Sequence, residues 1–235
     1  MDESEVGLAE APVVNKAFRW SFSQWEAYDE CPFRWKCASV LRLPRAPAGP
    51  AAARGTEMHD RAESYIKGER DHVDPDPDLR FGDRKPAVIH RRYIPILDEF
   101  RHHPNGARHT ELKIAFDEDW HLVPYTKPEA SCIMVFDAVR AGGAWQGIGK
   151  GDHDGKVWVG EWKSGQVKQR HPDQRKMYAM GALKYFYADE VTVTTYYLED
   201  THPPQALKVE ARHFEKLTDL WSQRRDLMRR DEICA

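Results

Sequence analysis

The side chains of this chain best suited to chemistry are a carboxylate and an ammonium group two positions apart, Glu161 and Lys163. Residues 156–165 alternate in a pattern rich in Val and Trp and end in Ser-Gly, which predicts a β-strand. Side chains two apart on a strand share one face, so Glu161 and Lys163 point the same way. Because a charged pair is costly to desolvate, it marks either a solvated strand end or a reactive site.

A second carboxylate, Asp137, stands on the apolar stretch before this strand. If the two strands are neighbours, Asp137 and Glu161 can share one divalent cation, and carboxylate oxygens suit Mg²⁺ or Mn²⁺. Such a cation polarises a phosphoryl oxygen and lowers the pKa of a bound water molecule. Lys163 cannot bind a metal, but it can orient the attacking water or offset charge on the phosphate. His59 adds an imidazole to the candidate ligands.

Each of these features alone also has a structural explanation. A Glu-x-Lys pair at a strand end is commonly solvated, and His59 with Glu63, four positions apart on a helix, is typical of a surface pair. A histidine-rich site around residues 101–103 and His109 is a weaker alternative, because no ordered motif surrounds it.

Asp152 and Asp154 are alternatives to Asp137, since they are closer in sequence to Glu161. Asp137 is preferred because apolar residues flank it in a strand pattern, whereas residues 149–155 are typical of a turn. The choice leaves Asp137 and Glu161 separated by 24 positions.

The elements that must position these side chains follow from periodicity and capping patterns. Ser23 and Glu26 form a capping-box pattern, and Thr56 after Gly55 predicts the N-cap of a later helix. Further helices are expected over residues 33–41, 85–103, 173–183 and 214–230, and strands over residues 111–116, 132–139, 156–165 and 190–198. Three consecutive strands predict an antiparallel meander, and the whole pattern predicts the α/β class, with a central mixed β-sheet flanked by α-helices.

Composition limits the remaining possibilities. With 235 residues, 41% of them hydrophobic, the chain is long enough for one sizeable core. Residues 1–16 lack periodicity and are expected to form a mobile arm, which leaves residues 17–235 as a single domain. The net charge of −3 argues mildly against a nucleic-acid-binding protein, although a site that collects carboxylates around cations shifts the charge the same way.

The start of the chain is acidic, unlike a signal peptide, and no apolar run approaches membrane-spanning length. The sequence therefore predicts a cytoplasmic protein with no membrane partner. Its four cysteines are scattered without Cys-x-x-Cys spacing, which favours free thiols over a zinc ribbon.

The order of these motifs resembles the PD-(D/E)XK nuclease superfamily, and most closely its RecB-type exonucleases, which include phage and CRISPR-associated members. The resemblance runs from about Ser21 to Leu198. It is carried by Ser23, Cys31-Pro32, Gly55-Thr56-Glu57-Met58-His59, Glu111, Phe136-Asp137, Glu161-Trp162-Lys163-Ser164-Gly165 and Gln174-Arg175-Lys176-Met177-Tyr178. It implies a restriction-endonuclease-like fold.

The resemblance also implies roles for individual residues. His59, Asp137 and Glu161, with the backbone carbonyl of Trp162, are expected to bind one or two Mg²⁺ or Mn²⁺ ions. Asp137, Glu161 and Lys163 are expected to be catalytic.

The helix that carries Gln174 and Tyr178 is expected to face the site and the DNA. Arg175 belongs to the basic cluster that flanks the site and is the expected phosphate contact. Glu111, which matches an upstream acidic position of the family, is a weaker candidate.

Three departures from the family pattern are visible. The 24 positions between Asp137 and Glu161 are more than the family usually shows. Many RecB-type relatives carry an iron–sulfur cluster on one early and three late cysteines, whereas this chain has Cys31 early and only Cys234 late. We therefore expect no cluster. Ser164 also replaces the commoner Thr after the lysine.

The function implied is a metal-dependent deoxyribonuclease, an exonuclease acting on linear DNA ends in phage or host recombination, replication or repair. A recombination or replication protein is an expected partner, and the host cytoplasm is the expected location if a phage encodes the chain. The alternative is a catalytically inactive nuclease fold that serves as a DNA-binding or assembly module. The aromatic residues Trp25, Tyr28 and Trp35 either stack on unpaired bases or pack in the core.

Overall fold

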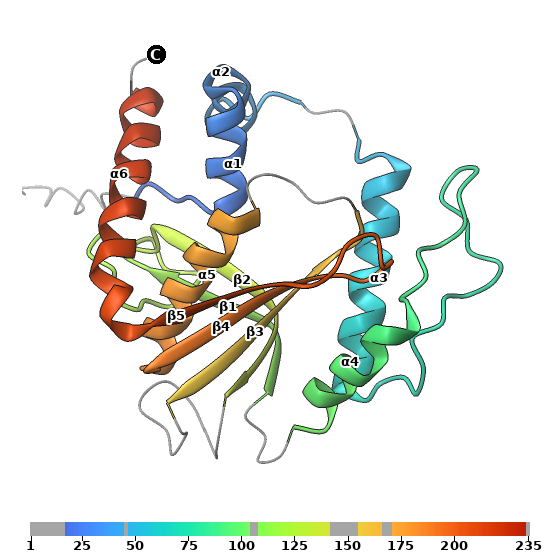
Figure 1. Cartoon of the computed structure of the whole chain (residues 1–235). Coiled ribbons are helices and arrows are strands. Elements are labelled where there is room, and N and C mark those ends of the chain that lie inside the picture. The colour runs from blue at the N-terminus through green and yellow to red at the C-terminus, as the bar shows by residue number, and fades with distance from the viewer. Residues whose placement is uncertain (1–16, 45–46, 104–107, 142–154, 166–170, 234–235) are drawn as a thin grey trace, which may run out of the picture.

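A computed structural model describes residues 17–44, 47–103, 108–141, 155–165 and 171–233. Figure 1 shows one five-stranded sheet with helices packed against it. The strands are β1 (Arg108–Phe116), β2 (Cys132–Ala141), β3 (Lys156–Lys163), β4 (Glu190–Tyr197) and β5 (Gln205–Glu210). The helices are α1 (Phe22–Glu30), α2 (Pro32–Trp35), the π-helix η1 (Lys36–Val40), α3 (Pro50–Lys67), the 3₁₀ turn η2 (Arg91–Tyr93), α4 (Ile94–Arg101), α5 (His171–Phe186), the 3₁₀ turn η4 (Ala211–His213) and α6 (Phe214–Ile233).

The sheet is mixed and its spatial order is β1-β2-β3-β4-β5. The first three strands form the predicted antiparallel meander. β3 and β4 run parallel, and β5 returns antiparallel to β4. Since a parallel pair needs a crossover connection, α5 lies between β3 and β4 in the chain. The predicted α/β class with a mixed, helix-flanked sheet is confirmed.

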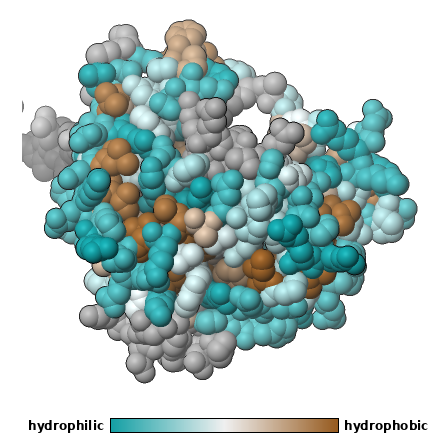
Figure 2. All heavy atoms as spheres, in the orientation of Figure 1, coloured by the Kyte–Doolittle hydropathy of each residue, from teal (hydrophilic) through white to brown (hydrophobic). Residues whose placement is uncertain are grey.

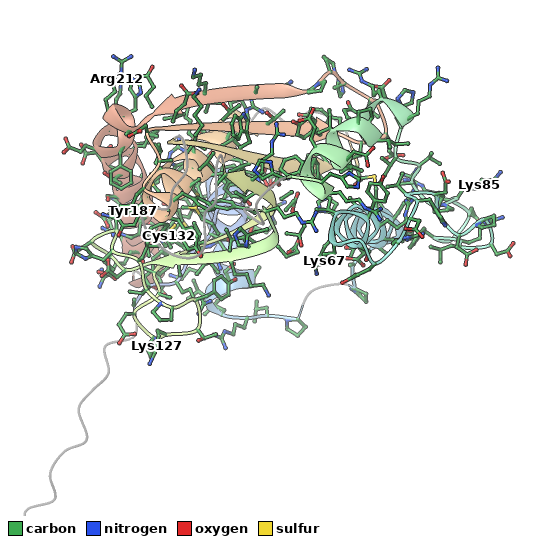
Figure 3. The ribbon with its side chains drawn as sticks, turned by 90° about the horizontal axis from the view of Figure 1, so that it is seen from below. Lys67, Lys85, Lys127, Cys132, Tyr187 and Arg212 are labelled. Carbon is green, nitrogen blue, oxygen red and sulfur yellow. The ribbon has the colours of Figure 1, made fainter. Side chains whose placement is uncertain are left out.

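Both faces of the sheet are buried, in two separate cores. Val157 and Val159 of β3 belong to the larger core, which joins the sheet to α1, α5 and α6. Trp162, on the opposite face of the same strand, belongs to the smaller core with α3 and α4. Its indole packs edge-on against Phe100, with the ring centroids 5.7 Å apart. Figure 3 shows Lys67 at the α3 end of the molecule, opposite Arg212 beside α6.

The N-terminal ends of two helices differ from their predicted positions. The helix expected at Ser23 begins at Phe22 with Ser21 as N-cap, so the predicted capping box is wrong. The earlier start places Phe22 and Trp25 on one buried helix face. Helix α3 begins at Pro50, not at Thr56, because proline at the first helical position costs no hydrogen bond.

The long helix predicted over residues 85–103 is wrong for its first half. Residues 85–90 have no regular secondary structure, and Val88, predicted to be inside, is 57% exposed between the buried Ala87 and Ile89. Pro95 lies in the first turn of α4 and starts that helix where a kink was expected. The expected mobile arm (residues 1–16), Asp152, Asp154 and Cys234 lie outside the described residues. Within the described part of the chain, no helix is long and apolar enough to cross a membrane.

Candidate active site

Three carboxylates, Glu111 of β1, Asp137 of β2 and Glu161 of β3, lie near one another, since the charge of Asp137 acts on both glutamates. Strand pairing is interrupted at this point. The register between β1 and β2 omits Glu111 and Asp137. The ladder between β2 and β3 ends at the pair Ala138 and Gly160, one position before Asp137 and Glu161. The carboxylate cluster therefore stands where the strands stop pairing.

Asp137 is held by two different elements. Its Oδ2 accepts a hydrogen bond of 2.6 Å from the backbone N–H of Trp162. Its Oδ1 lies 3.6 Å from Nδ1 of His59 on α3. Burial lowers the pKa of His59, but the adjacent Asp137 carboxylate and the charge of Glu161 raise it more, so the net pKa is above the ordinary value. The imidazole is thus fixed beside the carboxylate.

The approach of α3 to β3 depends on Gly55. A Cβ at Gly55 would lie 2.7 Å from Oγ of Ser164, the residue after β3. With Oγ of Ser164 in its present position, the helix packs this closely because residue 55 has no side chain. His59 follows four residues later on the same helix face, which brings it to Asp137. The four-residue spacing therefore lets Gly55 pack against Ser164 while His59 lies beside Asp137.

Glu161 is 5% exposed and its two oxygens differ. Oε1 accepts hydrogen bonds from Nζ of Lys163 at 2.5 Å and from Nε2 of Gln174 at 2.7 Å. Oε2 is buried and has no hydrogen-bond partner among the residues that the structure describes. Burial raises the pKa of Glu161 to about 7, and the charge of Asp137 acts in the same direction. An unpartnered buried carboxylate oxygen is unfavourable unless another group, such as a cation, satisfies it.

Lys163 remains an ammonium group despite its burial. Burial lowers the pKa of Lys163, but the charge of Glu161 and its hydrogen bond raise that pKa above the ordinary value. Glu26 of α1 also raises it by its charge, so α1 flanks the site. Sequence reasoning missed this neighbour, because Glu26 was explained as part of a helix cap.

Gln174 and Tyr178 lie one turn apart on α5 and are both buried. Gln174 contacts Glu161 directly, and the ring of Tyr178 packs against Phe136 with centroids 5.1 Å apart. Burial raises the pKa of Tyr178 well above its usual range, and the charge of Glu161 adds to the shift. The structure thus brings Gln174 into the carboxylate cluster, as expected.

Arg175 points elsewhere. It is 7% exposed, and its Nη1 donates to Oγ1 of Thr195 at 3.3 Å and to Oε1 of Gln205 at 3.2 Å. Burial lowers the pKa of Arg175. The guanidinium lies against β4 and β5, where Thr195 is the strand partner of Glu161.

Glu111 lies at the edge of the cluster. Its backbone φ of 49° is in the left-handed region, which is uncommon for a residue other than glycine. Burial raises the pKa of Glu111, and the nearby charges of Asp137 and Glu63 raise it further. Glu63, the helix neighbour of His59, forms an ion pair with Lys67 at 2.5 Å.

The donor types fit a hard divalent cation: an imidazole, three neighbouring carboxylates, and one buried carboxylate oxygen that has no partner among the described residues. In the described residues, however, no three His, Cys, Asp or Glu side chains are gathered as a metal-binding group. Lys163 and Gln174 occupy Oε1 of Glu161.

The alternative histidine cluster is not assembled. Nε2 of His103 lies 2.6 Å from the backbone oxygen of Ala141, and His102 lies 4.0 Å from Asp98.

A family model described as the PD-(D/E)XK nuclease superfamily matches residues 19–233. The chain belongs to this superfamily. Its members are nucleases that generally use divalent metal ions, which agrees with the donor types around Glu161. The solved structure titled "Crystal structure of SSO0001" is similar to 86% of this chain and 76% of its own, with a TM-score of 0.35 and 13% identity. No curated protein matches the chain significantly.

Proposed function

We propose that this superfamily member is a metal-dependent deoxyribonuclease of the RecB type that removes nucleotides from DNA ends. One observation carries the proposal. His59, Asp137, Glu161 and Lys163 come from α3, β2 and β3 to one corner of the sheet, and a buried oxygen of Glu161 lacks a partner there. An inactive relative would have no need to keep such an unfavourable group buried.

In this proposal His59, Asp137 and Glu161 hold Mg²⁺ or Mn²⁺, with the backbone carbonyl of Trp162. When bound, the cation supplies Lewis-acid polarisation of the scissile phosphate and a lowered pKa for water. Lys163 places a positive charge where charge builds on the phosphate in the transition state. Glu111 joins the ligands if a second ion binds.

The neighbouring groups orient this machinery. The N–H of Trp162 holds Oδ2 of Asp137, which keeps Oδ1 directed at His59. Gln174 holds Oε1 of Glu161, so its effect on catalysis passes through that carboxylate. Tyr178 packs beneath the same strands. We assign Gln174 and Tyr178 the role of positioning the metal ligands. Any DNA contact by Gln174, Tyr178 or Arg175 is secondary in this proposal.

An enzyme of this kind would act in recombination, replication or repair, with a partner protein that delivers DNA ends. The test uses linear duplex DNA labelled at one 5′ end, and a circular duplex, each with Mg²⁺, Mn²⁺ or EDTA. We expect metal-dependent release of nucleotides from the linear DNA alone.

The matched variants are Lys163→Ala and Lys208→Ala, because Lys208 is an exposed lysine on another strand of the same sheet. Lys163→Ala should lose at least about a hundredfold in rate, as for loss of one transition-state contact, and Lys208→Ala should lose none. Equal cutting of circular DNA would make the protein an endonuclease. DNA binding without cleavage of any substrate would support the inactive module.

A further inference from the structure

The segment of residues 32–44, here called the α2 segment, lies in a region of unusual composition. Between Glu30 and Glu57 the chain has no acidic residue, although its net charge is −3. The basic residues of this stretch are Arg34, Lys36, Arg42, Arg45 and Arg54. The stretch is therefore a local positive region on an acidic protein.

The same segment exposes large apolar side chains. Phe33 is 77% exposed, Leu41 54% and Leu43 50%. They are half of the large hydrophobic side chains that are exposed among the described residues, the others being Val88, Tyr187 and Leu227. Figure 2 shows apolar atoms at the tip of the molecule where Figure 1 places α2. By contrast, the aromatic residues first considered for base stacking, Trp25, Tyr28 and Trp35, are buried in the core.

Arg42 occupies a backbone position that favours glycine. Its φ is 52°, in the left-handed region, and the N–H of Leu43 donates to the carbonyl of Cys37 at 3.0 Å to close η1. Glycine is the usual residue at such a helix end, because a side chain there costs free energy. No described carboxylate pairs with Arg42, so the structure gives no ion pair that offsets this cost.

A basic groove borders the segment. A cavity of about 480 Å³ beside η1 is lined by Arg19, Arg42 and Arg229, with Glu232 as its one acidic residue. Arg34, on the other flank, pairs with Glu30, its one ion-pair partner in the described part of the chain, and both side chains of this pair are more than half exposed. Exposed pairs of this kind contribute little and exchange readily for a phosphate partner.

The α2 segment is joined in the chain to two elements of the candidate active site. It follows α1, whose Glu26 acts on Lys163 by its charge, and it leads to α3, which carries His59. Figure 1 shows α1 and α2 above the sheet and α3 beside it.

We propose that the α2 segment is a second DNA-contact surface, where Phe33, Leu41 and Leu43 lie against unpaired bases and Arg42 contacts a phosphate. The inference rests on the proposed function, since it assigns DNA as the substrate. A single-stranded DNA end combines negative phosphates with flat apolar bases, which matches the positive charge and exposed apolar side chains of the segment.

The first test measures binding of a fluorescent single-stranded oligonucleotide in EDTA, where metal-dependent cleavage does not occur. Phe33→Ala should weaken binding about fivefold or more, the loss expected for one base stack. Val88→Ala, which shortens another exposed apolar side chain, should have no effect. On an oligonucleotide with abasic sites, the Phe33→Ala loss should disappear. An equal loss on both oligonucleotides, or none, would overturn the base contact.

The second test uses Arg42→Gly, which separates stability from binding. The variant should unfold at a higher temperature, because glycine suits the left-handed position, and yet bind the oligonucleotide more weakly. The slope of log affinity against log salt should fall by about 0.7, the value for one phosphate contact on a single strand. An unchanged slope would overturn the phosphate contact.

Light scattering on Phe33→Ala and on the unaltered chain tests the alternative that the α2 segment binds a second copy of this chain. A dimer that becomes a monomer in Phe33→Ala, with DNA binding unchanged, would make the segment a self-association surface and overturn the proposal. Failure of the two proposals is distinguishable. If the chain binds DNA through this segment but never cleaves it, only the nuclease proposal fails; if it cleaves normally with Phe33→Ala and Arg42→Gly, only this inference fails.

Discussion

At the scale of single residues, Glu161 summarises the chemistry of the site. One of its oxygens accepts two hydrogen bonds, and the other is buried and accepts none. Burial alone would favour the protonated carboxyl, and the pKa of about 7 reflects this cost. Lys163 and Gln174 keep the carboxylate oriented while leaving the second oxygen available.

Gln174→Leu tests this orientation. Loss of the hydrogen bond to Glu161 should lower metal-dependent cleavage about tenfold to a hundredfold, as is typical when a group that orients a metal ligand is removed. The loss should shrink at saturating Mn²⁺ if it acts through cation affinity, which a titration of the cleavage rate would measure. Gln223→Leu on the exposed side of α6 is the control. Cleavage by Gln174→Leu at the unaltered rate would contradict the positioning role.

At the scale of elements, the site depends on how closely α3 packs against the end of β3. Gly55→Ala places a methyl group 2.7 Å from Oγ of Ser164, so either that hydroxyl turns or the helix moves. We expect a loss of about 1 kcal/mol in unfolding free energy, at the lower end for overpacking, because the hydroxyl can turn. Cleavage should fall as well, since His59 moves with the helix.

The double variant Gly55→Ala with Ser164→Ala is the matched control for this packing. The nearest remaining atom, Cβ of residue 164, is 3.7 Å from the added methyl group, an ordinary contact. Thermal unfolding and cleavage should therefore return toward the values of Ser164→Ala alone. A double variant as impaired as Gly55→Ala would show that the close contact with Ser164 is not the cause.

Asp173 joins α5 to α6 and gives a dependence of stability on pH. It pairs with Lys176 at 3.0 Å and with Arg224 at 2.9 Å. Burial raises the pKa of Asp173, but these cations outweigh it and lower the pKa below its ordinary value of 3.8. The unfolded chain therefore binds a proton more readily, and the ion pairs stabilise the fold above the ordinary pKa. This contribution is lost as the pH falls through the lowered pKa.

Asp173→Asn should thus reduce the unfolding free energy by about 1 kcal/mol at pH 7. In acid, the difference between the variant and the unaltered chain should begin to shrink below the ordinary pKa of 3.8 and disappear below the lowered pKa of Asp173. Urea unfolding across this range measures both values. A difference that stays constant into acid would show that the effect of the substitution is not electrostatic.

At the scale of the whole molecule, periodicity predicted four of the five strands because their apolar residues alternate or run continuously. The strand β5 was missed because it is a short edge strand in which only Val209 is fully buried. The start of α3 was missed because Gly55 was interpreted as a boundary, whereas it is a packing contact within the helix.

The residues of the site were predictable from the order of the motifs, but the geometry of the site was not. The resemblance named His59, Asp137, Glu161 and Lys163, and the structure brings these side chains together. The approach of Glu111 to Asp137 depends on how β1 and β2 pair, and a separation of 24 positions between Asp137 and Glu161 does not define strand pairing. The effect of Glu26 on Lys163 arises from tertiary packing alone.

Titration of the purified protein with Mn²⁺, followed by electron paramagnetic resonance, tests the central claim most directly. The unaltered chain and Lys163→Ala should both bind Mn²⁺, because the lysine is not a ligand, whereas Asp137→Asn should bind at least about tenfold more weakly. Only the unaltered chain should cleave DNA. Full Mn²⁺ affinity in Asp137→Asn, together with weakened Mn²⁺ binding in Asp152→Asn or Asp154→Asn, would contradict the assignment of the cation to Asp137.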